Sequence, residues 1–256
     1  MKEQLQKDFD NSIKNLSLSQ KDIEIKKFCL DNFIDKGFPN RKEEDWKFSD
    51  LNQIIKNNIG ELSFYNDQAT TNKVDTSVFV DGLEHNKIVF INGRIEKIDF
   101  EYEKKDQIEI IDQSETINEF KNSNSLSDLN NAFTNKCFKI LVKKGYQLVK
   151  PLIIYHTTNS KIWSKNINLR LNFEIDKDSS LRLIDLFNDT SEKNFLNIFY
   201  NFELKENAVL KNYKVDKFEN KNIKYAFNNI DQDKNSISET FILSSGSSFS
   251  KNEIHC

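Results

Sequence analysis

The chain has 256 residues, a formal net charge of −3 and a sequence pI of about 5.8. It therefore lacks the basic surface that general nucleic-acid binding needs, and we expect no nucleic acid as a partner. Its length suits one large domain or two small ones. No apolar run approaches the length of a membrane span, and the N-terminus has no apolar signal core, so we expect a cytoplasmic protein without a membrane partner.

The composition is polar for a globular protein, with 37% hydrophobic and 30% charged residues, although 21 Phe can still build a core. Cys29, Cys137 and Cys256 form an odd and widely spaced set. This set fits free thiols in a reducing compartment better than a disulfide framework.

The first expected element is a helix over 21–36. Ile25, Cys29 and Phe33 recur at four-residue steps, as they do on the buried face of a helix, and Gly37 is typical of a helix end. This helix presents an apolar stripe to the rest of the molecule.

A second helix is expected after Asn40, because Glu43 follows it at capping-box spacing. This helix carries Trp46, which we expect to be structural and to pack against the stripe of the first helix or against the core sheet. Ser49 is the expected cap of a third, short helix that begins near Leu51.

The clearest local signal before the core is the pair Asn92-Gly93 between two apolar runs. Both residues accept positive φ, so the stretch Lys87–Ile98 predicts a β-hairpin with a tight turn. The other expected elements are a loose connection over 66–77, a strand over 108–111 and a helical segment over 126–133.

From residue 137 onward, predicted strands alternate with short polar corners. Leu169, Leu171, Phe173 and Ile175 alternate with polar residues, which is the pattern of a half-buried strand, and the polar turn Asp176–Ser180 follows. Three further corners of this kind are Lys144–Leu148, Lys205–Leu210 and Ser245–Phe249. In each corner a turn-forming residue comes three positions before an apolar one: Gly145 and Leu148, Asp178 and Leu181, Asn207 and Leu210, Gly246 and Phe249.

Such loose repeats favour a mainly β protein built as a solenoid, in which each coil buries its apolar face against the next. An antiparallel sandwich joined by hairpins gives the same pattern, so both architectures remain open at this point. We place an N-terminal helical and mixed α/β region at residues 1–130 and the β core at residues 131–256.

The sequence is more informative about absent chemistry than about a site. None of the six glycines forms a phosphate-binding loop, and His85, His156 and His255 are scattered without metal-ligand spacing. We expect His156 to be a strand-end residue with a hydrogen bond. The acidic residues Asp176, Asp178 and Asp185 are interpreted as a solvated corner. His255 and Cys256 are adjacent and are not expected to share a metal. We assign no catalytic, cofactor-binding or metal-binding residue and expect no enzyme activity.

Three stretches together resemble the SufD family of iron–sulfur cluster assembly proteins. They are Gly37-Phe-Pro-Asn-Arg-Lys-Glu-Glu-Asp-Trp-Lys-Phe-Ser-Asp-Leu51, Val89-Phe-Ile-Asn-Gly-Arg94, and Leu129-Asn-Asn-Ala-Phe133 together with Gly145 through His156. The resemblance runs in order from about Gly37 to the end of the chain.

The resemblance implies a right-handed parallel β-helix behind the N-terminal region. It also implies a scaffold subunit that partners SufB and the ATPase SufC, with a cluster or its precursors present only in the assembled complex. The missing phosphate-binding loop fits an ATPase activity that belongs to the partner.

SufD proteins continue beyond the region that this chain matches, and the family's SufC-binding segment and SufB-pairing edge lie in that continuation. We therefore transfer no functional residue from the family and expect an incomplete β-helix. Residues 241–254 would then form an open edge, which predicts self-association and weak binding to SufC alone.

Two other functions compete with this hypothesis. One is a protein-binding β-solenoid unrelated to metal. The other is a β-solenoid enzyme that acts on polysaccharide, which would need paired carboxylates in a cleft. Co-purification with an ABC-type ATPase distinguishes the first from the scaffold, and turnover of a sugar polymer would support the second.

Overall fold

A computed structural model describes residues 2–14, 16, 18–64, 77, 79–113, 124–158, 163–189, 193–218 and 222–256, and of 188 and 189 the backbone only. Its helices are α1 Lys2–Lys14, α2 Gln20–Lys36, the 3₁₀ turn η1 Glu44–Trp46, α3 Leu51–Asn58 and α4 Ser125–Phe133. Its first strands are β1 Asn86–Ile91, β2 Arg94–Asp99, β3 Ile108–Asp112, β4 Cys137–Val142, β5 Leu152–Thr157 and β6 Asn166–Ile175. The later ones are β7 Ser180–Asp189, β8 Phe195–Leu204, β9 Val209–Phe218, β10 Ile223–Gln232, β11 Ile237–Ser245 and β12 Phe249–His255.

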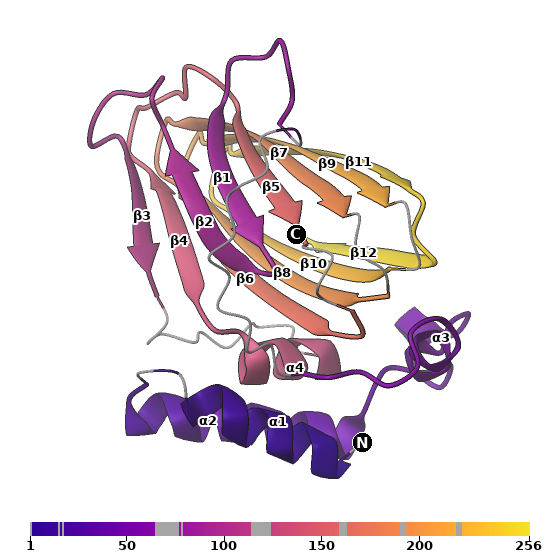
Figure 1. Cartoon of the computed structure of the whole chain (residues 1–256). Coiled ribbons are helices and arrows are strands. Elements are labelled where there is room, and N and C mark those ends of the chain that lie inside the picture. The colour runs from indigo at the N-terminus through magenta and orange to yellow at the C-terminus, as the bar shows by residue number, and fades with distance from the viewer. Residues whose placement is uncertain are drawn as a thin grey trace.

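The strands form two six-stranded sheets that enclose a common core (Figure 1). We call them sheet B, in the order β11-β9-β7-β5-β1-β2, and sheet C, in the order β12-β10-β8-β6-β4-β3. From β4 onward the chain alternates between the sheets, and every strand lies parallel to its neighbour one coil away. The protein is therefore a mainly β protein with a parallel β-solenoid of about 4 turns, and the antiparallel sandwich is wrong.

One coil of the solenoid spans 28 or 29 residues in its regular part, as the stacked corner residues show. Asp178, Asn207 and Asn235 have φ of 59°, 61° and 59°, a region that Asn and Asp tolerate better than most residues. The amide of Asn207 donates to Asp178, 29 residues earlier, at 2.7 Å. The amide of Asn235 donates to Asn207, 28 residues earlier, at 3.2 Å. Three of the predicted corners, those that contain Gly145, Asp178 and Asn207, belong to this stack.

The fourth predicted corner, Ser245–Phe249, is a turn, but it does not belong to the stack. It joins β11 to β12 and lies on the opposite side of the coil. The true fourth corner contains Asn235. The sequence pattern does not detect this corner, because the pattern requires an apolar residue three positions after the turn. Earlier coils have Leu181 and Leu210 at that position, and this coil has Ser238.

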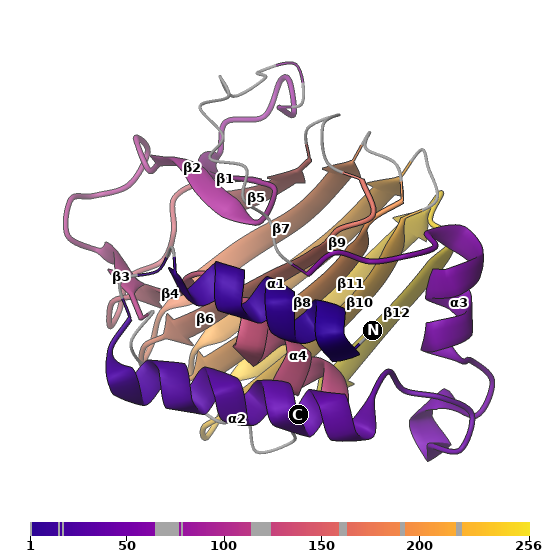
Figure 2. The same cartoon turned by 60° about the horizontal axis from the view of Figure 1, so that its bottom comes forward.

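The helical region packs on the outer face of sheet C (Figure 2). Helix α4 lies against β6 and β8, and α2 packs against α4. Helix α2 confirms the predicted apolar stripe, and the Gly37 N–H ends the helix by donating to the Phe33 carbonyl at 2.7 Å. Helix α1 was not predicted, although its buried residues Leu5 and Phe9 stand four positions apart.

The second predicted helix is wrong, because only the 3₁₀ turn η1 forms. The Glu43 carboxylate accepts from the Asn40 N–H at 3.1 Å, so one half of the capping box exists without a helix behind it. Helix α3 is capped one residue later than expected: the Asp50 carboxylate, and not Ser49, accepts from the Gln53 N–H at 2.9 Å. The predicted loose connection lies outside the described residues except for Ser77.

The predicted hairpin over Lys87–Ile98 is confirmed as β1 and β2, with φ of 54° at Asn92 and 79° at Gly93. Strand β1 pairs with β5 in parallel, and β3 pairs with β4 in antiparallel orientation. The strands that precede residue 131 therefore belong to the same two sheets as the coils.

Trp46 is buried, as predicted, and of the two expected partners it takes the sheet. Its ring lies 5.8 Å from Tyr225 of β10 and 6.1 Å from Phe249 of β12, measured between centroids. All three cysteines are unbridged. In the part of the chain that the structure describes, no helix combines the length and the apolar character needed to cross a bilayer.

Candidate functional site

The interior of the solenoid changes from apolar to polar along its axis. Register places the inward-facing residues of successive strands in columns, and the early coils fill them with Leu, Ile and Phe. Later members of several of these columns are polar, although two of the columns end in Ile242 and Ile254. In sheet B these columns read Leu152–Leu183–Asn212–Thr240, Ile154–Asp185–Lys214–Ile242 and His156–Phe187–Asp216–Ser244. In sheet C they read Ile167–Leu196–Lys224–Ser250 and Leu171–Tyr200–Asn228–Ile254.

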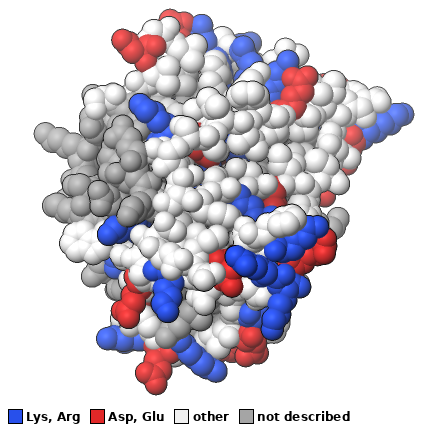
Figure 3. Space-filling model, turned by 90° about the vertical axis from the view of Figure 1, so that its right-hand side faces the viewer, with Lys and Arg blue, Asp and Glu red and all other residues white. Residues whose placement is uncertain are grey.

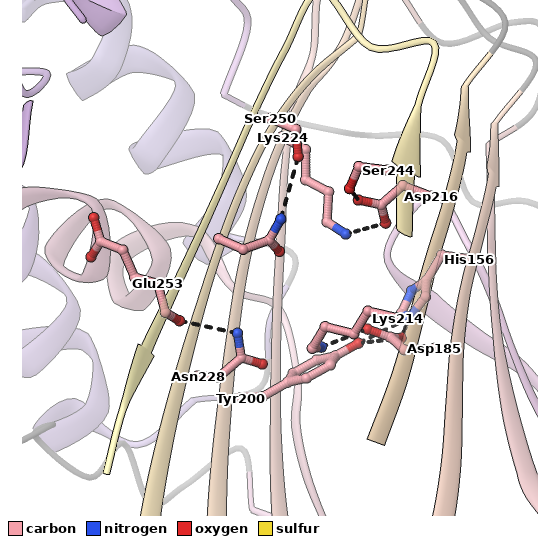
Figure 4. Close-up of polar contacts among 11 residues, drawn as sticks. His156, Asp185, Tyr200, Lys214, Asp216, Lys224, Asn228, Ser244, Ser250 and Glu253 are labelled. Carbon is pink, nitrogen blue, oxygen red and sulfur yellow. Dashed lines mark hydrogen bonds and ion pairs between the residues drawn. The ribbon is translucent and has the colours of Figure 1, made fainter. Parts of the chain in front are cut away.

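Four of these side chains form a hydrogen-bonded cluster across the lumen (Figure 4). Asp185 Oδ1 lies 2.7 Å from His156 Nε2 and accepts from the Tyr200 hydroxyl at 2.8 Å. Its Oδ2 accepts from Lys214 Nζ at 2.9 Å. Because the carboxylate can only accept, His156 Nε2 carries the proton in this contact. Tyr200 comes from sheet C and the other three from sheet B, so the cluster ties the two sheets together.

A second ion pair continues this cluster toward the last coil. Lys224 from β10 pairs with Asp216 from β9, and Ser244 of β11 donates to the other oxygen of Asp216 at 2.5 Å. Lys224 also lies over the ring of Phe187, 3.9 Å from its centroid. Asp216 and Lys224 are fully buried, whereas Ser244 is exposed, so the polar path reaches the surface at the last coil.

Charge compensation keeps these groups in defined states. Burial would raise the pKa of Asp185, but Lys214 and then His156 outweigh it and hold this pKa well below its ordinary range. Burial lowers the pKa of His156, and Asp185 offsets this only in part, so the imidazole is neutral at pH 7. Burial and the Asp185 carboxylate raise the pKa of Tyr200. Two lysines and two aspartates therefore balance, with neutral His and Tyr between them.

Several buried polar atoms near the end of the lumen have no hydrogen-bond partner among the described residues. They are both amide atoms of Asn212, Oδ1 of Asn228 and of Asn252, and Oγ of Ser238. Buried polar atoms of this kind are normally satisfied by ordered water. The last coils thus line the lumen with buried polar atoms, unlike the apolar lining of the early coils.

Access to His156 is narrow. Its ring is stacked between Phe90 and Phe187, at centroid distances of 5.3 Å and 4.0 Å. A cavity of about 20 Å³ touches it and is lined mainly by apolar residues. That space suits a water molecule, which needs roughly 10–15 Å³, and not an organic substrate. The arrangement therefore positions charged side chains inside the fold, beside a cavity about the size of one water molecule.

The sequence interpretation of the acidic residues needs a correction. Asp178 is exposed and Asp176 half-buried at a corner, but Asp185 is fully buried in the lumen and is no part of a solvated corner. Asp185 follows Leu181 and Leu183 at every second position of β7, so the three side chains share the inward face of the strand. This alternation is the signal that the sequence contains. The same alternation runs from Leu210 through Asn212, Lys214 and Asp216 to Phe218.

The three histidines lie apart, and each has local contacts. His156 is near the end of β5 with the expected hydrogen bond. His85 Nε2 lies 2.7 Å from the Tyr155 hydroxyl, and the His255 ring lies 4.8 Å from that of Phe227. Within the described ranges, no group of three or more His, Cys, Asp and Glu side chains could hold a metal ion.

Two cysteines lie beside buried cations under the helices. Cys137 of β4 is in register with Arg170 of β6, and Lys26 stands one turn from Cys29 on α2. Lys26 Nζ donates to the carbonyls of Asn131 and Thr134 at 3.0 Å and 2.7 Å. Burial raises the pKa of both thiols to about 11 despite these cations, so both are protonated at neutral pH and weak as nucleophiles.

Neither a scan against protein-family models nor a search of curated proteins gives a match to this chain.

Proposed function

We propose that the chain is a non-catalytic scaffold subunit of the SUF iron–sulfur cluster assembly machinery and partners SufB and the ATPase SufC in the cytoplasm. The observation that carries the proposal is the place of the three SufD-like stretches in a β-solenoid. Each lies at a junction of the solenoid: Gly37–Leu51 puts Trp46 on β10 and β12, Val89–Arg94 turns from β1 into β2, and Leu129–His156 leads through α4 into the first coil.

The open end of the solenoid supports a partner surface. In the described residues β11 pairs only with β9, and β12 only with β10, so both sheets end in strands with free backbone groups. Ile254, on the inward face of β12, is 41% exposed because no strand among the described residues lies over it. Figure 3 views this side of the molecule, where a broad uncharged area lies among scattered charged side chains. Open edges of this kind template pairing with another chain.

The opposite end of the solenoid is built differently. It ends in β2 and β3, whose sequences Arg-Ile-Glu-Lys-Ile-Asp and Ile-Glu-Ile-Ile-Asp are rich in charge, and both strands run antiparallel to their neighbours. Charged edge strands resist pairing. In the SufD family the SufB-pairing edge lies beyond this end, so the contrast favours the β11–β12 end as the side that faces SufB.

The chemistry of the lumen is better suited to a scaffold than to a polysaccharide-active enzyme. Asp185 and Asp216 are each paired with a lysine and fully buried, whereas glycosidic cleavage needs two carboxyl groups that face a substrate cleft. A protein-binding solenoid unrelated to metal is the second candidate, and the open edge is compatible with it as well.

Capture of SufB by the purified chain separates these two candidates. We expect a tagged chain to retain SufB in stoichiometric amount, and to retain SufC only when SufB is present. Ile254→Lys, which places a charge on the inward face of the edge strand, should abolish capture, and the matched control Ile98→Lys on β2 should not. Failure to retain SufB with a folded chain would overturn the proposal.

A further inference from the structure

The outer face of sheet B carries two apolar columns that run from the first coil to the last. In register they are Ile153–Ile184–Tyr213–Phe241 and Tyr155–Leu186–Val215–Leu243. The described helices pack on sheet C and leave this face free of helical cover (Figure 1).

The first half of these columns is covered by a segment of the chain itself, residues 79–85, which we call the strap. The ring of Phe79 lies 4.9 Å from that of Tyr155, between centroids. The Val80 N–H donates to the Tyr155 hydroxyl at 3.0 Å, and His85 Nε2 lies 2.7 Å from the same oxygen. Under the strap, Ile153 and Tyr155 are fully buried.

The strap combines apolar and acidic residues in a short space. Phe79 and Val80 are followed by Asp81 and Glu84. Glu84 reaches Lys150 at the rim of the face, with 2.7 Å between the charged atoms. The strap therefore shows which chemistry this face accepts: an aromatic ring over the columns next to an aliphatic residue, with a carboxylate directed to a lysine at the side.

The second half of the columns has the same character but no cover among the described residues. Tyr213, Phe241 and Leu243 are 41%, 56% and 54% exposed, which is unusual for large apolar side chains in register. Lysines stand beside them on the same face, as Lys150 does beside the strap. Lys217 is exposed, and Lys211 forms a surface ion pair with Glu239 at 3.2 Å.

We propose that the surface formed by Tyr213, Val215, Phe241 and Leu243 binds an extended segment of a partner protein that resembles the strap: an aromatic and an aliphatic residue side by side, followed by acidic residues. The apolar pair continues the cover that Phe79 begins, and the acidic residues meet Lys217 and Lys211. This surface lies on the face of the sheet, so it is distinct from the open edge proposed to meet SufB.

The test uses a labelled peptide with the sequence of residues 77–86 as the probe and the full chain as the receptor, with binding measured by fluorescence anisotropy. We expect saturable binding that weakens with added salt, because part of it is electrostatic. Phe241→Ser and Leu243→Ser should each weaken binding by about tenfold or more. Lys217→Glu should weaken binding and reduce its salt dependence. Ile98→Ser, which removes an exposed apolar side chain on β2, should leave binding unchanged.

Peptide variants and thermal denaturation complete the design. A peptide with alanine in place of Phe79 should not bind, and each protein variant should unfold near the wild-type temperature. Absence of binding to the folded wild type would overturn the proposal. Binding that survives Phe241→Ser but is lost in Tyr155→Phe would show exchange with the chain's own strap and would also overturn it. So would self-association that Phe241→Ser abolishes, because the surface would then belong to a second copy.

Discussion

At the scale of single residues, Trp46 connects the N-terminal region to the last coil. Its ring contacts Tyr225 and Phe249, and Lys251 lies over it at 5.0 Å while donating to the Asp45 carbonyl at 2.9 Å. Trp46 thus holds the edge strand β12 against the helical region.

We predict that Trp46→Ala lowers the free energy of unfolding by about 3–5 kcal/mol, the usual loss for a buried aromatic side chain. The matched control is Phe48→Ala, two positions away, whose side chain is 87% exposed and should change stability by less than about 0.5 kcal/mol. Urea denaturation measures both. Equal effects of the two variants would show that the contacts of Trp46 contribute nothing specific.

His156 gives the stability of the protein a defined pH dependence. Its folded-state pKa is below 6.5, whereas the unfolded chain takes up a proton near 6.5. The stability that the fold gains by holding His156 neutral is therefore fully present above pH 6.5. It is lost as the pH falls from there toward the folded-state pKa. The groups that face it are Asp185, Tyr200, Lys214 and Lys224, and Asp185 stays ionised over this range.

We predict that the free energy of unfolding of the wild type falls between pH 7 and pH 5, by at most about 1.4 kcal/mol per pH unit from this one proton. His156→Gln should flatten the fall, and His255→Gln, at an exposed position, should not. Urea denaturation across this pH range tests it. A fall as steep in His156→Gln as in the wild type would assign the effect to other groups.

At the scale of elements, the turn from β11 to β12 depends on a glycine. Gly246 has φ of 81°, and a Cβ at this position would lie 1.6 Å from the carbonyl oxygen of Phe218 at the end of β9. The turn therefore passes directly over the preceding coil, and no other residue fits without moving the backbone.

We predict that Gly246→Ala destabilises the protein by more than the 1–2 kcal/mol or so that left-handed backbone alone costs. Gly82→Ala is the control, because Gly82 has a similar φ of 72° and open space around its missing Cβ. Urea denaturation gives the loss in free energy of unfolding for each variant. The difference between the two losses measures the cost of the clash between the new Cβ and the Phe218 carbonyl. Equal losses would mean that the turn can move away from Phe218 without cost.

The sequence predicts elements best where a local rule applies. Asn92-Gly93 specifies its hairpin, and Asp178 and Asn207 mark two stacked corners. These residue types tolerate the positive φ that the turns require. The strand pattern alone left parallel and antiparallel pairing open, since pairing depends on partners 28 or 29 residues away. The parallel arrangement was expected from the family resemblance, and the structure confirms it. The corner before Ser238 was missed because that coil breaks the apolar rule.

The polar lumen was missed for a related reason. Asp185, Lys214 and Lys224 occupy inward positions of their strands, but charged residues in strands usually face water, so their residue types point away from the lumen. Only the structure shows that the coils bring each lysine to an aspartate, Lys214 to Asp185 and Lys224 to Asp216.

At the scale of the whole molecule, the two ends of the solenoid differ in their tendency to associate. The β11–β12 end presents free backbone groups and exposed apolar side chains, while β2 and β3 carry many charges at the other end. The isolated chain should therefore associate through the former.

We predict that light scattering on the purified chain detects a dimer or larger species whose fraction rises with concentration. Ile254→Lys should shift the chain toward monomer, because an inward-pointing charge on an edge strand opposes pairing. Ile98→Lys on β2 serves as the control and should associate like the wild type. A wild-type chain that stays monomeric at every concentration would show that the edge is protected.

The proposed role as a scaffold is tested most directly by the amount of iron–sulfur cluster that SufB and SufC assemble with and without this chain. Iron, a persulfide sulfur donor and ATP are supplied, and cluster is measured by its absorption and by iron and sulfide content. The account predicts that the chain alone binds no stoichiometric metal and hydrolyses no ATP. It also predicts that adding the chain to SufB and SufC raises the yield of cluster, and that the Ile254→Lys variant does not. An equal yield with and without the wild-type chain would contradict the account.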